Sequence, residues 1–290
     1  MTVEPIIIFD TSGLNKLADD LELACFEPAL KSGFFIRLTE TNVGEIIATP
    51  DNGRRQQLLQ LCRHLVTAGD CIYPYHWIIR ELVTAHHRKP MAFDWTTVKV
   101  RFRAAEKEIA FQEIINDTLA TEQRDHARNQ DREFAGIFDN ARPHFDELFI
   151  QKVTDRPTDF RGLVTRLQGP SGAYWNFGKG FYERSAKIRP DEDTIRKFID
   201  DCPPFRALIL VVCIAQYERC IREMPSGESY RAGAFDLYSS VYLPYCHRFI
   251  TADERQLNAL RQVTDVGRLG SAVVSYDDFW SGLTVRAAAR

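Results

Sequence analysis

Residues 5–12 read PIIIFDTS, an apolar run that ends directly at Asp10. Such a run, bounded by turn residues, is typical of a short strand that is buried on both faces of a parallel sheet. Residues 247–256, HRFITADERQ, repeat this arrangement near the other end of the chain, with Thr251 and then Asp253 after the apolar run. Because the carboxyl ends of parallel strands meet at one edge of a sheet, the two stretches predict an α/β fold with both carboxylates at that edge.

The other elements near the two ends of the chain extend this α/β pattern. They are predicted from the spacing of apolar residues and from the glycine, proline and capping residues at their boundaries. After the first strand we expect a helix over residues 14–25, a strand over 34–38, and a helix that begins at Thr41 or Asn42 and carries Glu45. Near the C-terminus we expect a helix over 235–245, a strand over 248–251, a helix over 254–262 and a strand over 272–275. Strands separated by helices favour a parallel sheet.

The middle of the chain has a different pattern from both ends. Residues 54–149 show almost entirely helical spacing, and helical spacing returns over residues 191–221. Between these stretches, residues 155–190 contain glycines that break the periodicity and favour a loop or lid. Neither end of the chain alone supplies enough strands for a stable sheet. We therefore predict one α/β domain with a large, mainly α-helical insertion, divided as residues 1–53 for the first part of the core, 54–230 for the insertion and 231–290 for the second part.

The composition limits the classes of protein to which the chain can belong. With 290 residues, 44% of them hydrophobic and 27% charged, the chain has ample material for a packed globular core. A formal charge of −3 excludes a uniformly basic nucleic-acid binder, so binding to a polyanion needs a local basic patch or a bound cation. The chain has no stretch that is apolar enough to cross a bilayer and no secretion signal, and its seven cysteines form no CxxC pair. We expect a cytoplasmic protein with buried, reduced thiols.

The two carboxylates at the strand ends would repel each other unless a cation neutralised them. A hard divalent ion, Mg²⁺ or Mn²⁺, is the natural partner of carboxylate oxygens. For Asp10 alone there is a structural alternative, in which its carboxylate caps the following helix through the turn at Thr11 and Ser12. The residues themselves leave both interpretations open.

Four stretches of the chain carry acidic residues in a particular order. They are IIIFDTS at residues 6–12, TNVGEII at 41–47, GAFDLYSSVYLPYC at 233–246 and FITADERQL at 249–257. In this order and in these structural contexts, they resemble the PIN-domain family of nucleases. The resemblance implies a PIN-like parallel sheet flanked by helices, with a catalytic, metal-binding site formed by Asp10, Glu45, Asp236 and Asp253. It also implies that Thr251 orients Asp253 and that Ser12 positions a carboxylate.

The function implied by this resemblance is that of a metal-dependent endonuclease that hydrolyses phosphodiester bonds. In such a site, divalent ions lower the pKa of a bound water and stabilise the charge that develops on phosphorus. Asp10, Asp236 and Asp253 would be the principal ligands, and Glu45 would be either a ligand or a group that holds a metal-bound water. RNA is favoured as the substrate over single-stranded DNA because the family acts mostly on RNA. A non-catalytic PIN-like module that binds nucleic acid or protein is the alternative, and we expect no membrane partner. A homo-oligomer and an inhibitory protein partner both remain open.

Two further hypotheses concern individual acids. Hydrolases of the haloacid dehalogenase type also place an Asp after the first strand, but they need a second acid two residues later, where this chain has Ser12. Glu81, in the stretch YPYHWIIRELVTAHH at residues 73–87, lies on an amphipathic pattern and could join the metal site or replace Glu45 there. The alternative for Glu81, which we favour, is a surface acid beside Arg80.

Residues 155–190 also offer a hypothesis for substrate binding. Seven basic residues outnumber three acidic ones in this segment, and aromatic residues lie between them. Aromatic rings can stack on unpaired bases, and basic groups can bind phosphates. We therefore expect Trp175, Lys179 and Arg184 to contact nucleic acid as part of a gate that borders the acidic cleft. In the structural alternative, the aromatic residues pack onto the helical insertion and the charges only solvate the segment.

Overall fold

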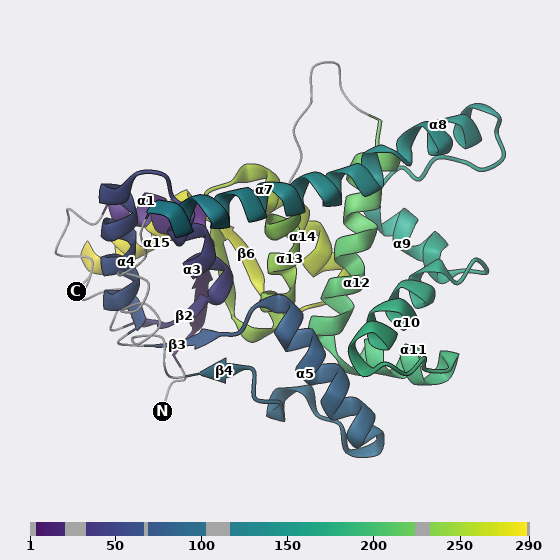
Figure 1. The fold of residues 1–290 in the computed structure, drawn as a ribbon, viewed down its shortest axis with the longest axis horizontal. Helices are drawn as coiled ribbons and strands as arrows, with labels where there is room; N and C mark the ends of the chain where they lie inside the picture. The colour runs from purple at the N-terminus through teal and green to yellow at the C-terminus, as the bar shows by residue number, and fades with distance from the viewer. Residues whose placement is uncertain (1–3, 21–32, 67–68, 103–116, 224–232, 289–290) are drawn as a thin grey trace.

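A computed structural model describes residues 4–20, 33–66, 69–102, 117–223 and 233–288 of the chain (Figure 1). Within these residues, six strands form one sheet in the order β4-β3-β2-β1-β5-β6. The strands are β1 (Ile6–Phe9), β2 (Phe35–Thr39), β3 (Gly69–Ile72), β4 (Arg101–Phe102), β5 (Arg248–Thr251) and β6 (Ala272–Ser275). Neighbouring strands pair in parallel throughout the series β3, β2, β1, β5 and β6. The remaining strand, β4, pairs with the edge of β3 in the antiparallel direction. The expected α/β class with a parallel sheet is confirmed, and the sheet is compatible with a PIN-like fold.

Helices cover both faces of this sheet (Figure 1). Those at the ends of the chain are α1 (Thr11–Asp20), α3 (Glu40–Ile47), α4 (Asn52–Val66), α13 (Ala234–Tyr238), α14 (Glu254–Gly267) and α15 (Tyr276–Ala288). Those in the middle are α5 (Tyr75–Arg88), α7 (Asp117–Asp139), α8 (Arg142–Ile150), α9 (Phe160–Gln168), α10 (Ala173–Ala186), α11 (Glu192–Asp201) and α12 (Pro203–Gln216). A π-helical turn, Tyr217–Ile221, continues α12, and a 3-10 helix, Ser239–Tyr245, continues α13. Two further 3-10 turns lie at Pro90–Ala92 and Trp95–Thr97.

Alternation along β1 divides the interior into two hydrophobic layers. Ile7 and Phe9 point to one face of the sheet, where they pack with residues of α1, α3, α4 and α15. Ile8 points to the other face and packs with residues of α5, α12 and α14. Because all three side chains are fully buried, the apolar run at the start of the chain forms a central strand of a three-layered fold.

The expected boundary of the insertion at residue 54 is corrected by the sheet. Both β3 and β4 fall within residues 54–230, yet they form one side of the central sheet. Ile72 of β3 belongs to the same buried cluster as the side chains of α9 to α12. The helical middle of the chain therefore shares its core with the sheet. The sequence pattern missed β3 because the strand, GDCI, is short and half of it is glycine and aspartate, which lack an apolar signal.

The segment expected to form a loop or lid is helical. Residues 160–168 form α9 and residues 173–186 form α10, although the segment contains several glycines. Gly178 lies on the buried side of α10, where a Cβ atom would come within 2.7 Å of Ile199 Cδ1. This glycine therefore permits close packing of α10 on α11. In the sequence alone, such a glycine cannot be told from one that ends a helix.

Several predicted boundaries also change. The helix that carries Glu45 begins earlier than expected, because Thr39 is its cap and Asn42 completes the capping box with it. The expected continuous helical pattern over 54–149 is interrupted by the strands and by the 3-10 turns. Helices over residues 191–221, 235–245 and 254–262 are confirmed, as are the strands over 34–38, 248–251 and 272–275, each within a few residues. The expected positions at residues 21–25, including Cys25, lie outside the described residues. The six described cysteines are free and buried.

A buried ion pair ties the middle strands together. Arg37 of β2 is 2% exposed and faces its register partner Asp70 on β3, with Nε 2.6 Å and Nη2 3.0 Å from the two carboxylate oxygens. Its Nη1 donates to the backbone carbonyl of Tyr245. The guanidinium thus links β2, β3 and the segment that leads into β5.

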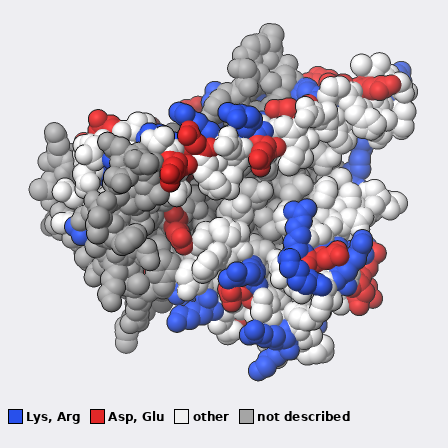
Figure 2. Space-filling model, viewed as in Figure 1, with Lys and Arg blue, Asp and Glu red and all other residues white. Residues whose placement is uncertain are grey.

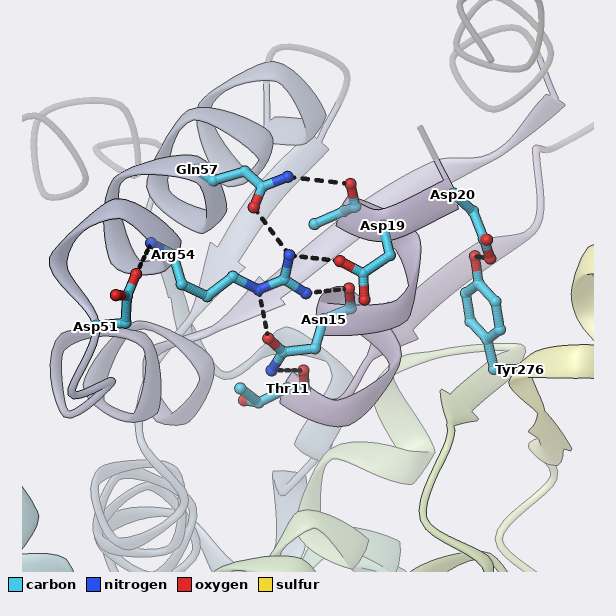
Figure 3. Close-up of polar contacts among 9 residues, drawn as sticks. Thr11, Asn15, Asp19, Asp20, Asp51, Arg54, Gln57 and Tyr276 are labelled. Atoms are coloured by element: carbon cyan, nitrogen blue, oxygen red, sulfur yellow. Dashed lines mark hydrogen bonds and ion pairs between the residues drawn. The ribbon is translucent and has the colours of Figure 1, made fainter. Parts of the chain in front are cut away.

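A second arginine holds α4 against α1, close to the start of that helix (Figure 3). Arg54 donates from Nε to Asn15 Oδ1 at 3.1 Å, and from Nη2 to the carbonyl of Asn15 at 2.6 Å. Its Nη1 lies 2.6 Å from Asp19 Oδ1. Asn15 in turn donates to the carbonyl of Thr11, so this network reaches the first residue of α1. Among the described helices, none is both long and apolar enough to span a membrane.

Replacement of Asp70 by alanine should strongly destabilise the protein, because Arg37 would remain buried without its partner. We expect a loss of about 3 to 5 kcal/mol in the free energy of unfolding, measured by urea denaturation. Asp265→Ala is the matched control, because it breaks an exposed pair with Arg161 and should cost less than about 1 kcal/mol. Equal losses in the two variants would show that the buried pair does not hold the sheet together.

Candidate functional site

The predicted acidic residues come from elements that meet at the carboxyl end of the sheet. Asp10 follows β1 and Asp253 follows β5, and these strands are neighbours in parallel register. Glu45 lies on α3, and Asp236 lies on α13. Each of these groups is close enough to at least one other for their charges to interact. The structure therefore brings the four acids to one end of the sheet, as the sequence predicted.

Asp10 is held by the start of the helix that follows it. Its Oδ1 accepts a hydrogen bond of 2.7 Å from the Gly13 amide, and both of its oxygens lie within 3.0 Å of the Ser12 hydroxyl. Burial raises the pKa of Asp10 above its ordinary value, whereas the bonds from Gly13, Ser12 and Thr251 oppose this rise. Asp10 therefore caps α1, as one of the two alternatives for this residue expected, and the same carboxylate also interacts with the other acids.

Two hydroxyl groups connect the ends of β1 and β5. Ser12 Oγ accepts a 2.9 Å hydrogen bond from the Ala252 amide and lies 3.3 Å from Thr251 Oγ1. Thr251 Oγ1 accepts from the Asp253 amide at 3.0 Å. Thr251 therefore fixes the backbone of Asp253, and a hydrogen bond from its hydroxyl also lowers the pKa of Asp10. Both residues expected to support the site lie within it.

The fold strongly alters the protonation of Glu45. Thr11 donates its hydroxyl hydrogen to Glu45 Oε2, and Asn42 Nδ2 donates to that same hydroxyl at 3.2 Å. Burial, with smaller contributions from the charges of Asp236, Asp10 and Asp131, raises the pKa of Glu45 to about 8. The first cause is thus burial, and the repulsion expected from the sequence adds to it.

Asp131 is a fifth acid that the sequence analysis missed. It lies on α7, and its Oδ1 accepts a 2.8 Å hydrogen bond from the amide of Ala234, the first residue of α13. Asp236 Oδ2 accepts from the preceding amide, that of Gly233, at 2.8 Å. A Cβ atom on Gly233 would lie 3.2 Å from Asp131 Oδ1 and 3.3 Å from Asp236 Oδ2, so the two carboxylates flank this glycine closely.

A signal for Asp131 was present in the sequence. Ala120, Ala127 and Phe134 recur every seven residues and mark the inner face of α7. Asp131 lies four residues after Ala127 and three before Phe134, which places a charge on that same face. Charges of both signs alternate along this helix, a pattern typical of a solvated surface, and this pattern hides an acid that faces inward.

Asp236 and Asp253 share the same mode of support. Burial is the main cause that raises the pKa of Asp236 to about 6. The hydrogen bond from Gly233 opposes this rise, and the charges of Asp253, Asp10 and Asp131 add smaller contributions to it. Asp253 Oδ1 caps α14 by accepting from the amides of Arg255 at 2.7 Å and Gln256 at 2.9 Å. Each carboxylate thus uses one oxygen to hold a helix start, and its orientation is fixed by the backbone.

The donor set suits a hard divalent cation, because it consists of carboxylate and hydroxyl oxygens. Yet no group of three or more His, Cys, Asp or Glu side chains in the described part of the chain could hold an ion directly. The carboxylates influence each other's protonation without closing around a single point. In this arrangement, an ion would take at most two of these side chains as direct ligands and the rest through water.

A cavity opens beside the acidic residues, and we call it the side cavity. It has a volume of about 320 Å³ and lies between α3, the first turn of α5, α7 and the start of α13. Glu45, Asp131 and Asp236 line one part of it. The remaining wall includes aromatic, amide and imidazole side chains, which the sequence analysis did not single out: Tyr75, His76, Gln123, His126, Gln130 and Phe235.

The residues predicted outside the acidic cluster have other environments. Glu81 is partly exposed and lies 3.6 Å from Arg80, as expected for a surface acid, and it does not line the side cavity. Trp175 is only 8% exposed, because its ring packs against Tyr174 and under Arg196, whose guanidinium lies 4.4 Å from the ring centre. Its predicted role as a stacking platform is therefore corrected, since a buried ring offers no face to a base.

The basic residues of the predicted gate are engaged on the helical surface. Lys179 lies 3.8 Å from Glu192, and Arg184 covers the ring of Phe181. Figure 2 shows many Lys and Arg side chains at the lower right, over α5, α10 and α11, with Asp and Glu side chains among them, and charges of both signs also lie along α7. A contact of Lys179 or Arg184 with nucleic acid remains a prediction.

A scan against protein-family models, a search of curated proteins and a search of solved structures each find no match to this chain.

Without a divalent cation, the protein should lose stability as the pH rises from about 5 to about 9. The folded state keeps a proton on Glu45 up to a pKa of about 8, whereas the unfolded chain releases it near 4.5. The contribution of this group to stability is therefore complete at low pH and is lost as the pH rises through the folded pKa. Urea denaturation in a chelator should show this decline, and Glu45→Gln should flatten it. Glu254→Gln, at an exposed carboxyl group, should leave the profile of the wild type unchanged. A wild-type profile with no decline in this range would show that Glu45 is not buried as described.

Proposed function

We propose that this protein is a metal-dependent phosphodiesterase, an endonuclease that acts on RNA. The observation that supports this function is the convergence of five acids from distant parts of the chain: Asp10, Glu45, Asp131, Asp236 and Asp253. Burial and mutual repulsion raise the pKa of several of them, so the cluster opposes folding in the absence of a compensating charge. A fold that keeps such a cluster at the carboxyl ends of its parallel strands is suited to binding a cation and a polyanion together.

Each residue has a distinct part in the proposed reaction. A divalent cation, when bound, would lower the pKa of a water molecule and offset the charge on the scissile phosphate. Asp10 and Asp236 are its proposed direct ligands, because their orientations are fixed by Gly13 and Gly233. Ser12 and Thr251 keep Asp10 in place from the neighbouring strand ends. Burial raises the pKa of Glu45 to about 8 in the absence of a cation, and a bound cation would lower it, so that Glu45 could accept a proton from an attacking water.

A second candidate function is binding without cleavage. It is favoured by the absence, in the described residues, of a group of three or more His, Cys, Asp or Glu side chains that could hold a metal ion. It is also favoured by the helix-capping bonds, which give Asp10 and Asp253 a structural purpose. Under this alternative, the chain would be a PIN-like module that recognises nucleic acid or protein. The two functions differ in whether a divalent cation binds and whether the phosphodiester bond breaks.

The wild-type protein should cleave single-stranded RNA when Mn²⁺ or Mg²⁺ is present and should be inactive in a chelator. Asp10→Asn changes one oxygen to nitrogen and removes the charge, so we expect a loss of at least about 100-fold in the cleavage rate, in the range seen when one charge-stabilising group is removed from an active site. Asp265→Asn, at an exposed position, should retain the wild-type rate. A labelled RNA analysed by gel electrophoresis measures all three. Equal cleavage rates for the wild type and Asp10→Asn would show that the activity comes from a contaminant and would contradict this proposal.

Addition of Mn²⁺ should raise the melting temperature of the wild-type protein at pH 8, where the cluster is most charged. At a concentration about 100-fold above the dissociation constant, the expected stabilisation is about 2.7 kcal/mol. Asp236→Asn should bind the ion more weakly and show a smaller shift, whereas Asp265→Asn should show the full shift. If neither Mn²⁺ nor Mg²⁺ changes the melting temperature, while RNA does, the binding module becomes the better account of the fold.

A further inference from the structure

The side cavity lies next to the acids, but its own walls have a different chemistry. Among the described residues that line it there is no Lys or Arg, although four acids line it: Glu40, Glu45, Asp131 and Asp236. A phosphate group would therefore be repelled from its interior. Its volume of about 320 Å³ is at the small end of the range for ligand pockets, about 300 to 1,000 Å³. The occupant is thus a small group that carries no negative charge.

One wall of the side cavity is aromatic and rigidly supported. The ring of Tyr75 stacks on Tyr238, with centroids 4.2 Å apart and planes inclined by 3°. Phe134 packs against Tyr238 from another side. Phe235 adds a second ring to the lining. Because the supporting rings hold Tyr75 in place, a planar ligand can contact this wall with little loss of side-chain entropy.

Another part of the wall is formed by polar side chains of α7, which crosses above α3 and α13 in Figure 1 and contacts both. Gln123 and Gln130 are seven residues apart and therefore lie on the same face of the helix. His126 lies between them, and its Nε2 is 2.9 Å from Gln130 Nε2. A side-chain amide offers both a donor and an acceptor, which is the combination that matches the edge of a nucleobase.

We propose that the side cavity binds one unpaired nucleobase of an RNA strand whose backbone lies at the acidic residues. A base is planar and uncharged and carries hydrogen-bonding groups on its edge, so it matches the aromatic wall and the amides of α7. Glu45, Asp131 and Asp236 border the same cavity, and a base seated in it brings its own phosphodiester linkage to the acidic cluster. This inference rests on the proposed function and specifies its substrate as single-stranded or locally unpaired RNA.

A neighbouring feature extends the same path outside the cavity. Trp77 is 44% exposed and follows Tyr75 and His76 in the first turn of α5. The guanidinium of Arg80 lies 5.0 Å from its ring centre. An exposed ring beside a basic group suits stacking with the next base of a single strand. Figure 2 shows Lys and Arg side chains over α5, α10 and α11, among Asp and Glu side chains, and the phosphates that follow could bind to these basic groups.

Gly44 provides a direct test, because a Cβ atom on this residue meets no atom within 4 Å and points into open space of a cavity that Gly44 lines. Gly44→Leu should therefore fill the cavity without a clash and improve the helix propensity of α3. Gly282→Leu is the matched control, since Gly282 is an exposed glycine of another helix that also has open space around it. The probe is a fluorescently labelled, single-stranded RNA, and its dissociation constant is measured by anisotropy in a chelator, so that no cleavage is needed.

We expect Gly44→Leu to weaken RNA binding about 5-fold to 150-fold, since a stacked base contributes about 1 to 3 kcal/mol. An RNA with one abasic nucleotide, moved through successive positions, should weaken binding to the wild type by a similar factor at one position. That abasic RNA should show no additional loss with Gly44→Leu, because both changes remove the same interaction. Gly282→Leu should bind both RNAs as the wild type does. If Gly44→Leu fails to fold, the exposed pair Gln123→Ala and Gln130→Ala tests the same wall.

The outcomes separate this inference from the proposed function. Suppose that the wild type cleaves RNA, that it binds abasic RNA as tightly as intact RNA, and that Gly44→Leu binds RNA as tightly as the wild type. These results would overturn the base-binding inference and leave the nuclease proposal intact. The expected binding results without any cleavage in Mn²⁺ or Mg²⁺ would support base binding and remove the catalytic proposal. No measurable affinity of the wild type for single-stranded RNA would overturn the inference.

Discussion

The hydroxyl group of Ser12 joins two parts of the chain that are 240 residues apart, and the acidic site depends on this junction. It donates to Asp10 at the end of β1 and accepts from the Ala252 amide at the end of β5. The Asp10 amide also donates to the carbonyl of Ile250 at 2.9 Å. This approach is possible because Gly13 has no side chain: a Cβ atom there would lie 3.0 Å from the Ile250 carbonyl oxygen and 3.1 Å from Asp10 Oδ1. Without that close approach, Asp10 and Asp253 would not lie side by side at one edge of the sheet.

The sequence predicted those parts of the fold in which a local pattern and a tertiary role coincide. The runs at Ile6–Phe9 and Arg248–Thr251 are apolar because their strands are central, and the acids that follow them are placed by the direction of the strands. The sequence could not identify β3, since its burial comes from the neighbouring strand and its residues carry little β signal. Asp131 was missed for a related reason: its position beside Gly233 is created by the packing of α7 on α13, which joins segments that are about a hundred residues apart. The helices α9 and α10 were missed because glycines that allow close packing resemble glycines that end a helix.

The same bonds serve the stability of the helices and the arrangement of the acids. Asp10, Asp236 and Asp253 each accept a hydrogen bond from an amide at a helix start, which satisfies backbone groups that would otherwise lack a partner. This contribution offsets part of the free energy lost by burying negative charges near one another. The capping and functional interpretations of Asp10 are therefore compatible. Asp236 and Asp253, each anchored through one oxygen, present the other in a fixed direction, whereas an unanchored carboxylate would have to be ordered each time a ligand bound.

The helix α7 combines two tasks on a single face. Asp131 belongs to the acidic cluster, whereas Gln123 and Gln130 belong to the wall of the side cavity. The amide side chains are exposed and take no part in the packing of the core, so substitutions at these positions are nearly free of structural penalty. Asp131, in contrast, accepts a hydrogen bond from the backbone of α13, so its substitution would remove a structural contact. Over evolutionary time, the amide positions of this helix can therefore diversify quickly while Asp131 is retained. If the proposed base-binding role holds, related chains are expected to differ in the base they select before they differ in the reaction they catalyse.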